Sequence, residues 1–270
     1  MTFANFKGGV GKTSTTALTS YNFAKKGYKC LVVDFDAQAN VTSLLIKTRP
    51  TTENIIDINT TLMSALNKDI NLEKIIINIK PNLDLIPNTS DFGLYPRFLE
   101  RNFNDDLSRI TFFKKKLEDL KEKYDFIFID VPPTLSLLNE TAFFACNQII
   151  VVLQTQEHSL SGAEVFIKYL QETLINEFKS ELDILGILPV LTKRQSIVDK
   201  EILKFAIEEF GSNNMFENKI NAMERIKRMD LQGITDDPKD MHDKNVHKSF
   251  AVLVDEILIR LQERGYNYGK

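Results

Sequence analysis

The fold of this chain is decided close to its N-terminus, by the stretch Lys7-Gly8-Gly9-Val10-Gly11-Lys12-Thr13-Ser14. The stretch follows an apolar run, Thr2–Phe6, that has the length of a β-strand, and we expect a helix to begin after it at about Gly11. Glycines let such a loop wrap closely around an anion, because a Cβ atom would clash there, while backbone N–H groups and the helix N-terminus point inward. The sequence therefore predicts a phosphate-binding loop between the first strand and the first helix.

The last residues of the loop carry the chemistry expected of such a site. The Lys12 ammonium would reach the β- and γ-phosphates, and the Thr13 hydroxyl would ligate Mg²⁺. Phe6 stands where the strict GxxxxGK[ST] pattern has its first glycine, so the loop is a variant of that pattern. An ordinary tight turn is the alternative interpretation, and the Lys12-Thr13 pair in register after the glycines argues against it.

Two further apolar runs end in carboxylates. Val33-Asp34-Phe35-Asp36-Ala37-Gln38-Ala39-Asn40 places two acids at the end of one run, and Phe126–Pro133 places Asp130 at the end of the other, as in a Walker B strand. Ligands of open α/β sheets bind at the carboxyl edge, so these acids are expected beside the phosphate loop. The alternative for Asp34 and Asp36 is a pair of solvated strand-end acids that cap the next helix, and for Asp130 a purely structural role.

The rest of the chain alternates strand-like and helix-like segments. Strands are expected at Thr2–Phe6, Cys30–Asp34, Leu83–Pro87, Phe126–Asp130, Ile149–Gln154 and Ile184–Leu191, and helices at Lys12–Lys26, Leu107–Lys123, Leu160–Phe178 and Val198–Phe210. Continuous apolar strands are typical of a sheet that is covered by helices on both faces. We therefore predict an α/β fold with a doubly wound, mostly parallel sheet flanked by helices.

The lysine at position 7 precedes the glycine pair and marks the deviant Walker A group, and here the chain resembles the ParA/MinD/Soj family of P-loop ATPases. The resemblance continues through Asn82–Ser90 and Thr134–Gly162 and covers most of residues 2–210. It implies that Lys7 reaches the nucleotide of a second subunit and that Asp36 holds the attacking water near the metal. The residues implied are Lys7, Lys12 and Asp36 for catalysis, Lys7, Gly8, Gly9, Val10, Gly11, Lys12, Thr13 and Ser14 for ATP, and Thr13, Asp36 and Asp130 for Mg²⁺.

The function implied by this resemblance is that of a DNA-segregation, or partition, ATPase of the ParA/Soj type. Such an enzyme hydrolyses ATP slowly to ADP and phosphate, forms a homodimer on ATP and binds DNA without sequence preference. A centromere-binding, ParB-like partner protein stimulates hydrolysis and so releases the DNA. The resemblance thus implies a cytoplasmic, nucleoid-associated protein with no membrane partner.

The resemblance becomes weak in Asn218–Lys244, where a basic cluster lies. Lys219–Arg228 holds four cationic side chains against Glu224 alone, in a chain whose formal net charge is −3. Such a cluster would neutralise DNA phosphates without reading bases, and the alternative is a solvated helix face. The DNA-binding residues predicted in this way are Arg194, Lys219, Arg225, Lys227 and Arg228.

The length and composition indicate a single folded domain. At 270 residues with two cysteines, the chain can form a core without disulfides, and Cys30 and Cys146 are expected inside it as reduced thiols. We expect one P-loop ATPase domain over residues 1–270, in which residues 211–270 form a C-terminal helical portion that packs on the rest. No signal peptide is recognised, no N-terminal helix-turn-helix is expected before the first strand, and the three histidines lack the spacing of metal ligands.

Three other functions share this phosphate loop. A MinD-like membrane-cycling ATPase needs a basic amphipathic C-terminal helix, whereas Phe250–Arg264 mixes both charges. An electron-transfer ATPase resembling the nitrogenase iron protein needs cysteines that hold a cluster, and a dethiobiotin-synthetase-like ligase needs its own substrate pocket. The adenine contacts stay open, with Leu191–Gln195 as the expected place.

Overall fold

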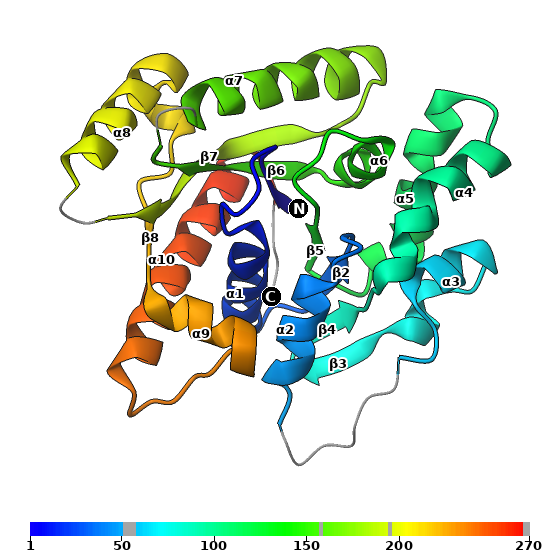
Figure 1. The fold of residues 1–270 in the computed structure, drawn as a ribbon, viewed down its shortest axis with the longest axis horizontal. Helices are drawn as coiled ribbons and strands as arrows, with labels where there is room; N and C mark the ends of the chain where they lie inside the picture. The colour runs from blue at the N-terminus through cyan, green and yellow to red at the C-terminus, as the bar shows by residue number, and fades with distance from the viewer. Residues whose placement is uncertain (51–57, 157–158, 194–195, 267–270) are drawn as a thin grey trace.

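The computed structural model describes residues 1–50, 58–156, 159–193 and 196–266, in which short strands alternate with longer helices (Figure 1). The strands are β1 (Thr2–Ala4), β2 (Cys30–Asp34), β3 (Ile77–Lys80), β4 (Leu83–Ile86), β5 (Phe126–Asp130), β6 (Gln148–Gln154), β7 (Asp183–Thr192) and β8 (Ile220–Asn221). The α-helices are α1 (Lys12–Lys25), α2 (Asn40–Thr48), α3 (Leu62–Asn67), α4 (Tyr95–Asn102), α5 (Asp106–Lys121), α6 (Leu137–Ala145), α7 (Ser159–Tyr169), α8 (Ile197–Phe210), α9 (Glu224–Gln232) and α10 (Met241–Glu263). Short 3₁₀ helices occur at η1 (Leu72–Ile75), η2 (Ser90–Leu94) and η4 (Ser212–Asn214), and a π-helix, η3 (Leu170–Glu177), continues α7.

The strands form one curled layer. Hydrogen bonding gives the orders β3-β4-β2-β5 and β1-β6-β7-β8, in which the β3–β4 pairing is antiparallel and the others are parallel. The two halves meet at β5 and β1, where the Met1 nitrogen donates to the Ile127 carbonyl (2.7 Å) and the Ile129 N–H donates to the Met1 carbonyl (2.9 Å). The predicted fold class, a doubly wound, mostly parallel sheet flanked by helices, is confirmed.

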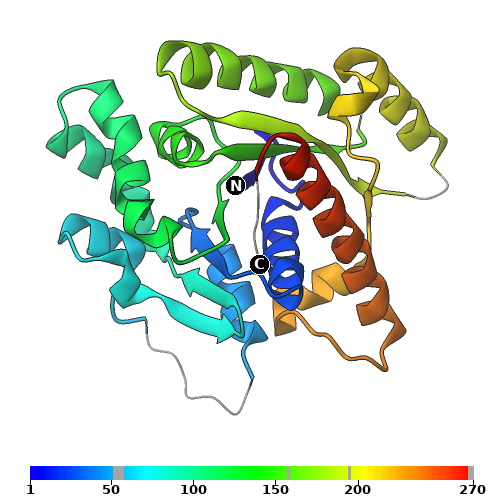
Figure 2. The ribbon, with the colours of Figure 1, turned by 180° about the vertical axis from the view of Figure 1, so that it is seen from behind.

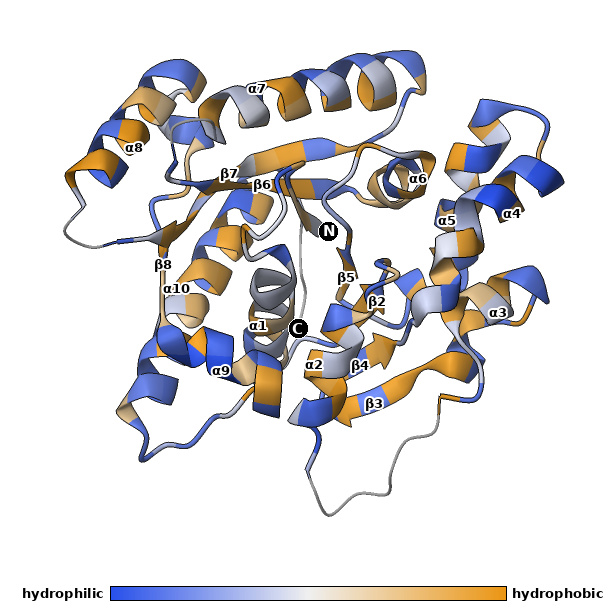
Figure 3. Ribbon diagram, in the orientation of Figure 1, coloured by the Kyte–Doolittle hydropathy of each residue, from blue (hydrophilic) through white to orange (hydrophobic). Residues whose placement is uncertain are grey.

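The central strands are apolar on both faces because each face carries its own layer of helices. Along β2, Cys30 and Val32 pack in one hydrophobic cluster and Leu31 and Val33 in the other, and all four side chains are fully buried. Figure 3 shows β2, β6 and β7 coloured hydrophobic over much of their length, whereas α9 is largely hydrophilic. Successive strand residues point to opposite faces, so a run with no polar member needs cover on both sides.

Both helical layers can be seen in each of two opposite views of the molecule, with the curled sheet between them (Figures 1 and 2). Helices α1 and α10 lie side by side on one face, with α2 and α9 beside them, and their buried residues share one cluster. Helices α5, α6 and α7 cover the other face. Phe250, Leu253, Val254, Ile257 and Leu261 attach α10 to the cluster that contains the buried side of α1. The last long helix therefore packs directly against the helix that follows the phosphate loop.

Most expected elements are found, with differences at their ends. The strands Cys30–Asp34 and Phe126–Asp130 have the predicted bounds, whereas β1 ends at Ala4 rather than Phe6. Strands β3 and β8 were not predicted, because β3 is a half-buried edge strand and β8 consists of two residues paired to the end of β7. The helix expected over Leu160–Phe178 changes from α to π geometry at Leu170.

Over the described ranges, no helix combines the length and the apolar character that a bilayer crossing requires.

Candidate active site

The phosphate loop connects β1 to α1 at the carboxyl edge of the sheet. Gly9 and Gly11 have φ values of 72° and 77°, a left-handed conformation in which a side chain would be strained. The helix begins at Lys12, one residue after the predicted start, so the N–H groups of its first turn have no intrahelical acceptor. A Cβ atom on Gly8 would lie 3.7 Å from the Pro133 ring, which shows that the loop after β5 lies against the phosphate loop. The loop therefore has the geometry that an anion requires.

Lys12 points back over the loop. Its Nζ atom donates to the Lys7 carbonyl (3.0 Å), and the residue is only 6% exposed. Burial lowers the pKa of Lys12 to about 8, against the opposing influence of the Asp130 and Asp36 carboxylates. An ammonium that is poorly solvated and loosely held by a carbonyl is ready to exchange that carbonyl for phosphate oxygens.

Asp130 ends β5 directly beside β2, in register with Asp34. It is fully buried, Thr16 Oγ1 donates to its Oδ1 atom (3.4 Å), and the nearby Thr13 hydroxyl acts to lower the pKa of the carboxyl group. Its Oδ2 atom is buried without a hydrogen-bond partner among the described residues. Burial, and next the Asp34 carboxylate, raise the pKa of Asp130 to about 8.

An orphaned carboxylate oxygen beside a threonine hydroxyl fits a hard cation. Mg²⁺ prefers oxygen ligands and usually uses one or two protein groups together with phosphate oxygens, so Thr13 and Asp130 match its requirements. Within the described ranges no cluster of three or more His, Cys, Asp or Glu side chains forms a separate metal site. His242 is exposed and His247 is buried, while His158 lies outside the described residues.

The two acids after β2 have different surroundings. Asp34 is fully buried and accepts hydrogen bonds from the Thr42 N–H (2.9 Å), the Thr42 hydroxyl (2.6 Å) and the Asp36 N–H (3.1 Å). The Asp34 carboxylate therefore anchors the start of α2, in agreement with the alternative interpretation that it caps this helix, but it is buried and not solvated. Burial raises the pKa of Asp34 to about 6.

Asp36 lies two residues further on, at the edge of the site. Its side chain is half-buried and accepts one hydrogen bond from the Gln38 N–H (2.9 Å). Its backbone carbonyl accepts from the Asn88 side chain (3.3 Å). The carboxylate thus keeps most of its lone pairs for a ligand or a water molecule, on a backbone that neighbouring residues hold in place.

Lys7 is held within its own chain. Its Nζ atom donates to the Gln156 side chain, and the Ser159 hydroxyl lies 3.5 Å away. Its backbone N–H donates to the Asn5 side chain (3.0 Å), which itself donates to the Val152 carbonyl (2.6 Å). The contact of Lys7 with a second subunit therefore stays a prediction. Asn5, Gln156 and Ser159 were given no role from the sequence, although Gln156 and Ser159 lie in the stretch Thr134–Gly162 that resembles the family and Asn5 directly follows β1.

A pocket of about 220 Å³ lies beside the phosphate loop. Leu191, in the stretch where adenine contacts are predicted, lines this pocket, and Gln195 lies outside the described residues. The other lining residues are Gly9, Val10, Gly11, Ser14, Thr15, Val190, Ile220, Ala222, Met223, Glu224, Ile226, Lys227, Asp230 and Phe250. Its largely apolar walls suit a nucleobase.

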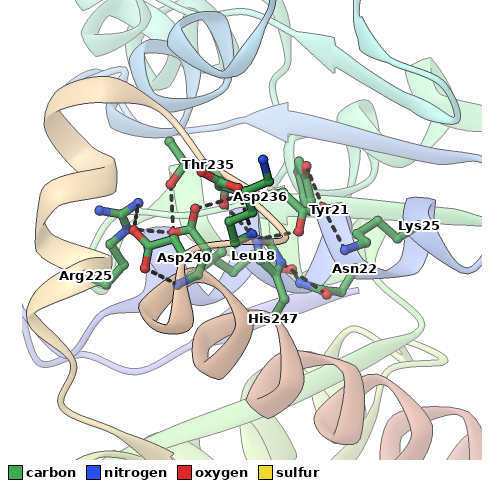
Figure 4. Close-up of polar contacts among 12 residues, drawn as sticks. Leu18, Tyr21, Asn22, Lys25, Arg225, Thr235, Asp236, Asp240 and His247 are labelled. Atoms are coloured by element: carbon green, nitrogen blue, oxygen red, sulfur yellow. Dashed lines mark hydrogen bonds and ion pairs between the residues drawn. The ribbon is translucent and has the colours of Figure 1, made fainter.

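The predicted DNA-binding residues do not form one free surface. Arg225 pairs with Asp243 (Nε–Oδ1 2.5 Å). It also pairs with Asp240 (Nη2–Oδ2 3.0 Å), as Figure 4 shows, and the two pairs hold α9 on α10. The DNA contact predicted for Arg225 stays a prediction, and it would have to compete with these two ion pairs. Lys219 and Arg228 are exposed, Lys227 pairs with Glu224 (2.8 Å), and Arg194 lies outside the described residues.

Comparison with known proteins agrees with this geometry. A profile of the family described as AAA domain, AAA_31, matches residues 1–184. The chromosome-partitioning ATPase Soj of Treponema pallidum is 28% identical over 266 residues, which cover 98% of this chain and 98% of that protein. The sporulation initiation inhibitor protein Soj of Bacillus subtilis is 30% identical over 205 residues, which cover 74% of this chain and 77% of that protein. The chain belongs to the ParA/Soj family of P-loop ATPases.

The fold of this ParA-type ATPase is shared with solved structures. A putative plasmid partition protein of Borrelia burgdorferi, bound to AMPPNP, aligns with a TM-score of 0.76 at 21% identity and covers 97% of this chain and 98% of that one. The similarity to the two Soj proteins confirms the recognised resemblance to ParA/Soj-type partition ATPases, and a MinD-like membrane-cycling protein is not favoured.

Proposed function

We propose that this ParA/Soj-type protein is an ATP-dependent partition ATPase that dimerises on ATP, binds DNA without sequence preference and is released by hydrolysis. The observation that carries the proposal is the grouping of Lys12, Asp36 and Asp130 around the left-handed glycine loop, with one Asp130 oxygen buried and unpartnered. The relationship to Soj proteins supports the choice of DNA segregation over other P-loop reactions.

MgATP would supply the phosphoryl group and a divalent charge. Lys12 would neutralise the phosphate oxygens, and Thr13 and Asp130 would hold the cation. Asp36 would orient the attacking water with a carboxylate that has a single backbone donor. A carboxylate with no strong base character positions water rather than deprotonating it, so a slow basal rate is expected.

Dimerisation would depend on Lys7. In the single chain its ammonium is bound to Gln156 and lies near Ser159. These are contacts between a cation and neutral oxygens, which phosphate oxygens of a second subunit's nucleotide would replace at a gain in electrostatic energy. The pairing of two subunits would therefore require triphosphate in the site.

DNA binding would use exposed cations near the C-terminal portion, residues 211–270. Lys219 and Arg228 remain from the predicted cluster, and two subunits together would double the phosphate contacts. A ParB-like, centromere-binding partner would stimulate hydrolysis and return the protein to the free state. We place this cycle in the cytoplasm, on the nucleoid.

A gel shift with non-specific duplex DNA, run with ATP, ADP and no nucleotide at two salt concentrations, tests the proposal. In the presence of ATP, the wild-type protein should retard the duplex in the gel at low salt but not at high salt. The Asp36→Ala variant should give an ATP-bound dimer that stays on the DNA. Asp119→Ala, which removes an exposed acid on α5, is the matched control and should behave as wild type. Parental ATP turnover in Asp36→Ala would show that the catalytic assignment is wrong.

A further inference from the structure

The loop between β5 and α6, residues 131–136, is called the β5–α6 loop below. It lies against the phosphate loop, since a Cβ atom on Gly8 would be 3.7 Å from the Pro133 ring. Pro132 and Pro133 fix the backbone angle φ at two consecutive positions and bring no N–H group to the loop. At these positions the rest of the protein can hydrogen-bond to the loop backbone only through carbonyl oxygens.

One side chain of α6 binds two carbonyl oxygens of this loop. The Asn139 Nδ2 atom donates to the Pro132 carbonyl (2.8 Å) and to the Thr134 carbonyl (2.6 Å). Over the described ranges, the backbone of residues 132–135 makes no other hydrogen bond. Because the two carbonyls flank Pro133, a single amide group holds the loop on both sides of its contact with Gly8.

Asn139 is itself held firmly by the core. It is only 2% exposed, and its neighbours Leu138 and Phe143 belong to the same hydrophobic cluster as Ile129 of β5. Its Oδ1 atom is buried and has no hydrogen-bond partner among the described residues. A buried acceptor without a partner costs stability, and an apolar side chain of similar size would avoid this cost. Packing alone therefore does not explain an asparagine at this position, whereas the two bonds to the loop do.

We propose that Asn139 is a positioning residue for ATP hydrolysis, which fixes the β5–α6 loop over the phosphate loop. The inference rests on the proposed function and adds a residue that acts through the loop. Asp130, which would hold the cation, ends the strand directly before this loop, so the position of the loop shapes the surroundings of that carboxylate. A small displacement of groups around a reacting centre can lower the rate by about a hundredfold. Nucleotide binding through Lys12 and the loop glycines would continue without Asn139.

The hold on the loop is tested without any nucleotide. The chain has no tryptophan, so Leu135→Trp places a single fluorescent reporter on the β5–α6 loop, at a side chain that is 51% exposed. Time-resolved anisotropy should show a larger amplitude of nanosecond motion when Asn139→Ala is added to this reporter. The matched control is Asn22→Ala, which removes a buried amide that donates to the Leu18 carbonyl (2.7 Å) within α1, and it should leave the reporter unchanged. Equal reporter motion with and without Asn139 overturns the inference.

The effect on hydrolysis is measured by steady-state kinetics in protein without the reporter. Asn139→Ala should lower kcat about tenfold and change KM for ATP by less than about twofold, because the groups that bind the nucleotide stay in place. Asn22→Ala loses a buried hydrogen bond of the same kind and should keep the parental kcat. If Asn139→Ala does not fold, as judged by circular dichroism, Asn139→Leu fills the same space without the donor and replaces it in both assays. A parental kcat, or a raised KM with kcat unchanged, overturns the inference.

Failure of the proposed function can be told apart from failure of this inference. If the wild-type protein does not hydrolyse ATP in the presence of Mg²⁺, the proposed function is wrong and Asn139 has no reaction to serve. If the wild-type protein hydrolyses ATP and the Asn139 variant does so at the same rate, the function stands and Asn139 has a structural role alone.

Discussion

Arg225 ties α9 to the start of α10, and its removal should destabilise the protein rather than simply weaken DNA binding. The Asp243 side chain is 1% exposed and the Arg225 side chain 16%. Asp243 Oδ1 also accepts from the Thr235 hydroxyl (2.9 Å), and its Oδ2 atom accepts from the Asp237 N–H (3.0 Å). The loop before α10 is thus folded around one buried carboxylate, whose neighbours Figure 4 shows.

The size of the effect follows from the titration of Asp243. Burial alone would raise the pKa of Asp243, but the hydrogen bonds from Arg225, Asp237 and Thr235 overcome it and hold the pKa at about 2, below the ordinary 3.8. At about 1.4 kcal/mol per pKa unit, this difference corresponds to about 2 to 3 kcal/mol at neutral pH. Breaking a buried pair costs about 3 to 5 kcal/mol in general. We expect Arg225→Ala to lower the free energy of unfolding by about 2 to 4 kcal/mol.

The assay is urea unfolding followed by circular dichroism, with Arg228→Ala as the control. The Arg228→Ala substitution removes the same charge from an exposed position of α9 and should change the free energy of unfolding by less than about 0.5 kcal/mol. The depressed pKa of Asp243 gives stability that is present above pH 3.8 and is lost as pH falls through about 2. The difference in the free energy of unfolding between wild type and Arg225→Ala should therefore become smaller in acid. Equal midpoints for the two arginine variants at pH 7 would refute the reasoning.

Three further predictions concern the site and the packing around it. Asp130→Asn should stabilise the nucleotide-free protein by about 2 to 4 kcal/mol at pH 8 and by little at pH 4, because the raised pKa of Asp130 makes stability fall as pH rises through this range. In the same variant, Mg²⁺ should no longer raise the melting temperature beyond the value reached with ATP alone. A nucleotide-free Asp130→Asn protein that is less stable than wild type would contradict the unfavourable burial assigned to the Asp130 carboxylate. Lys12→Ala should abolish binding of a fluorescent ATP analogue while keeping the circular dichroism of wild type, and retained affinity would exclude its phosphate role. Gly233→Ala should destabilise by more than about 2 kcal/mol in urea, since φ is 88° and a Cβ would lie 2.4 Å from the Lys47 carbonyl. Gly211→Ala, at φ 82° and with the Asn214 side chain 4.0 Å from the added Cβ, should cost about 1 kcal/mol.

The parts of the fold that could be predicted are those whose signal is local. The bounds of β2 and β5 follow from their five-residue apolar runs, and the phosphate loop follows from its own glycines and lysines. Strands β3 and β8 could not be predicted, because a half-buried edge strand and a two-residue strand leave no apolar run. The π geometry of Leu170–Glu177 has no counterpart in the spacing of its apolar residues.

For the candidate site, too, some features could be predicted from the sequence and others could not. The pattern of residues identified the acids at the ends of β2 and β5, but not that Asp34 is bound by Thr42 while one Asp130 oxygen lacks a partner. Charge counting grouped Arg225 with exposed cations because a sequence shows the sign of a charge and not its partner. Asp243 lies 18 positions away, and only the packing of α9 on α10 brings it to Arg225.

By itself, the sequence determined the phosphate loop, the two acidic strand ends, the parallel sheet and the family, because each depends on residues that are close together in the chain. Only the folded chain shows which carboxylate oxygen lacks a partner and which cationic side chains are paired. Those properties depend on burial and on contacts between distant segments. A titratable group takes its role from the surroundings that folding gives it, and residue order alone does not specify them.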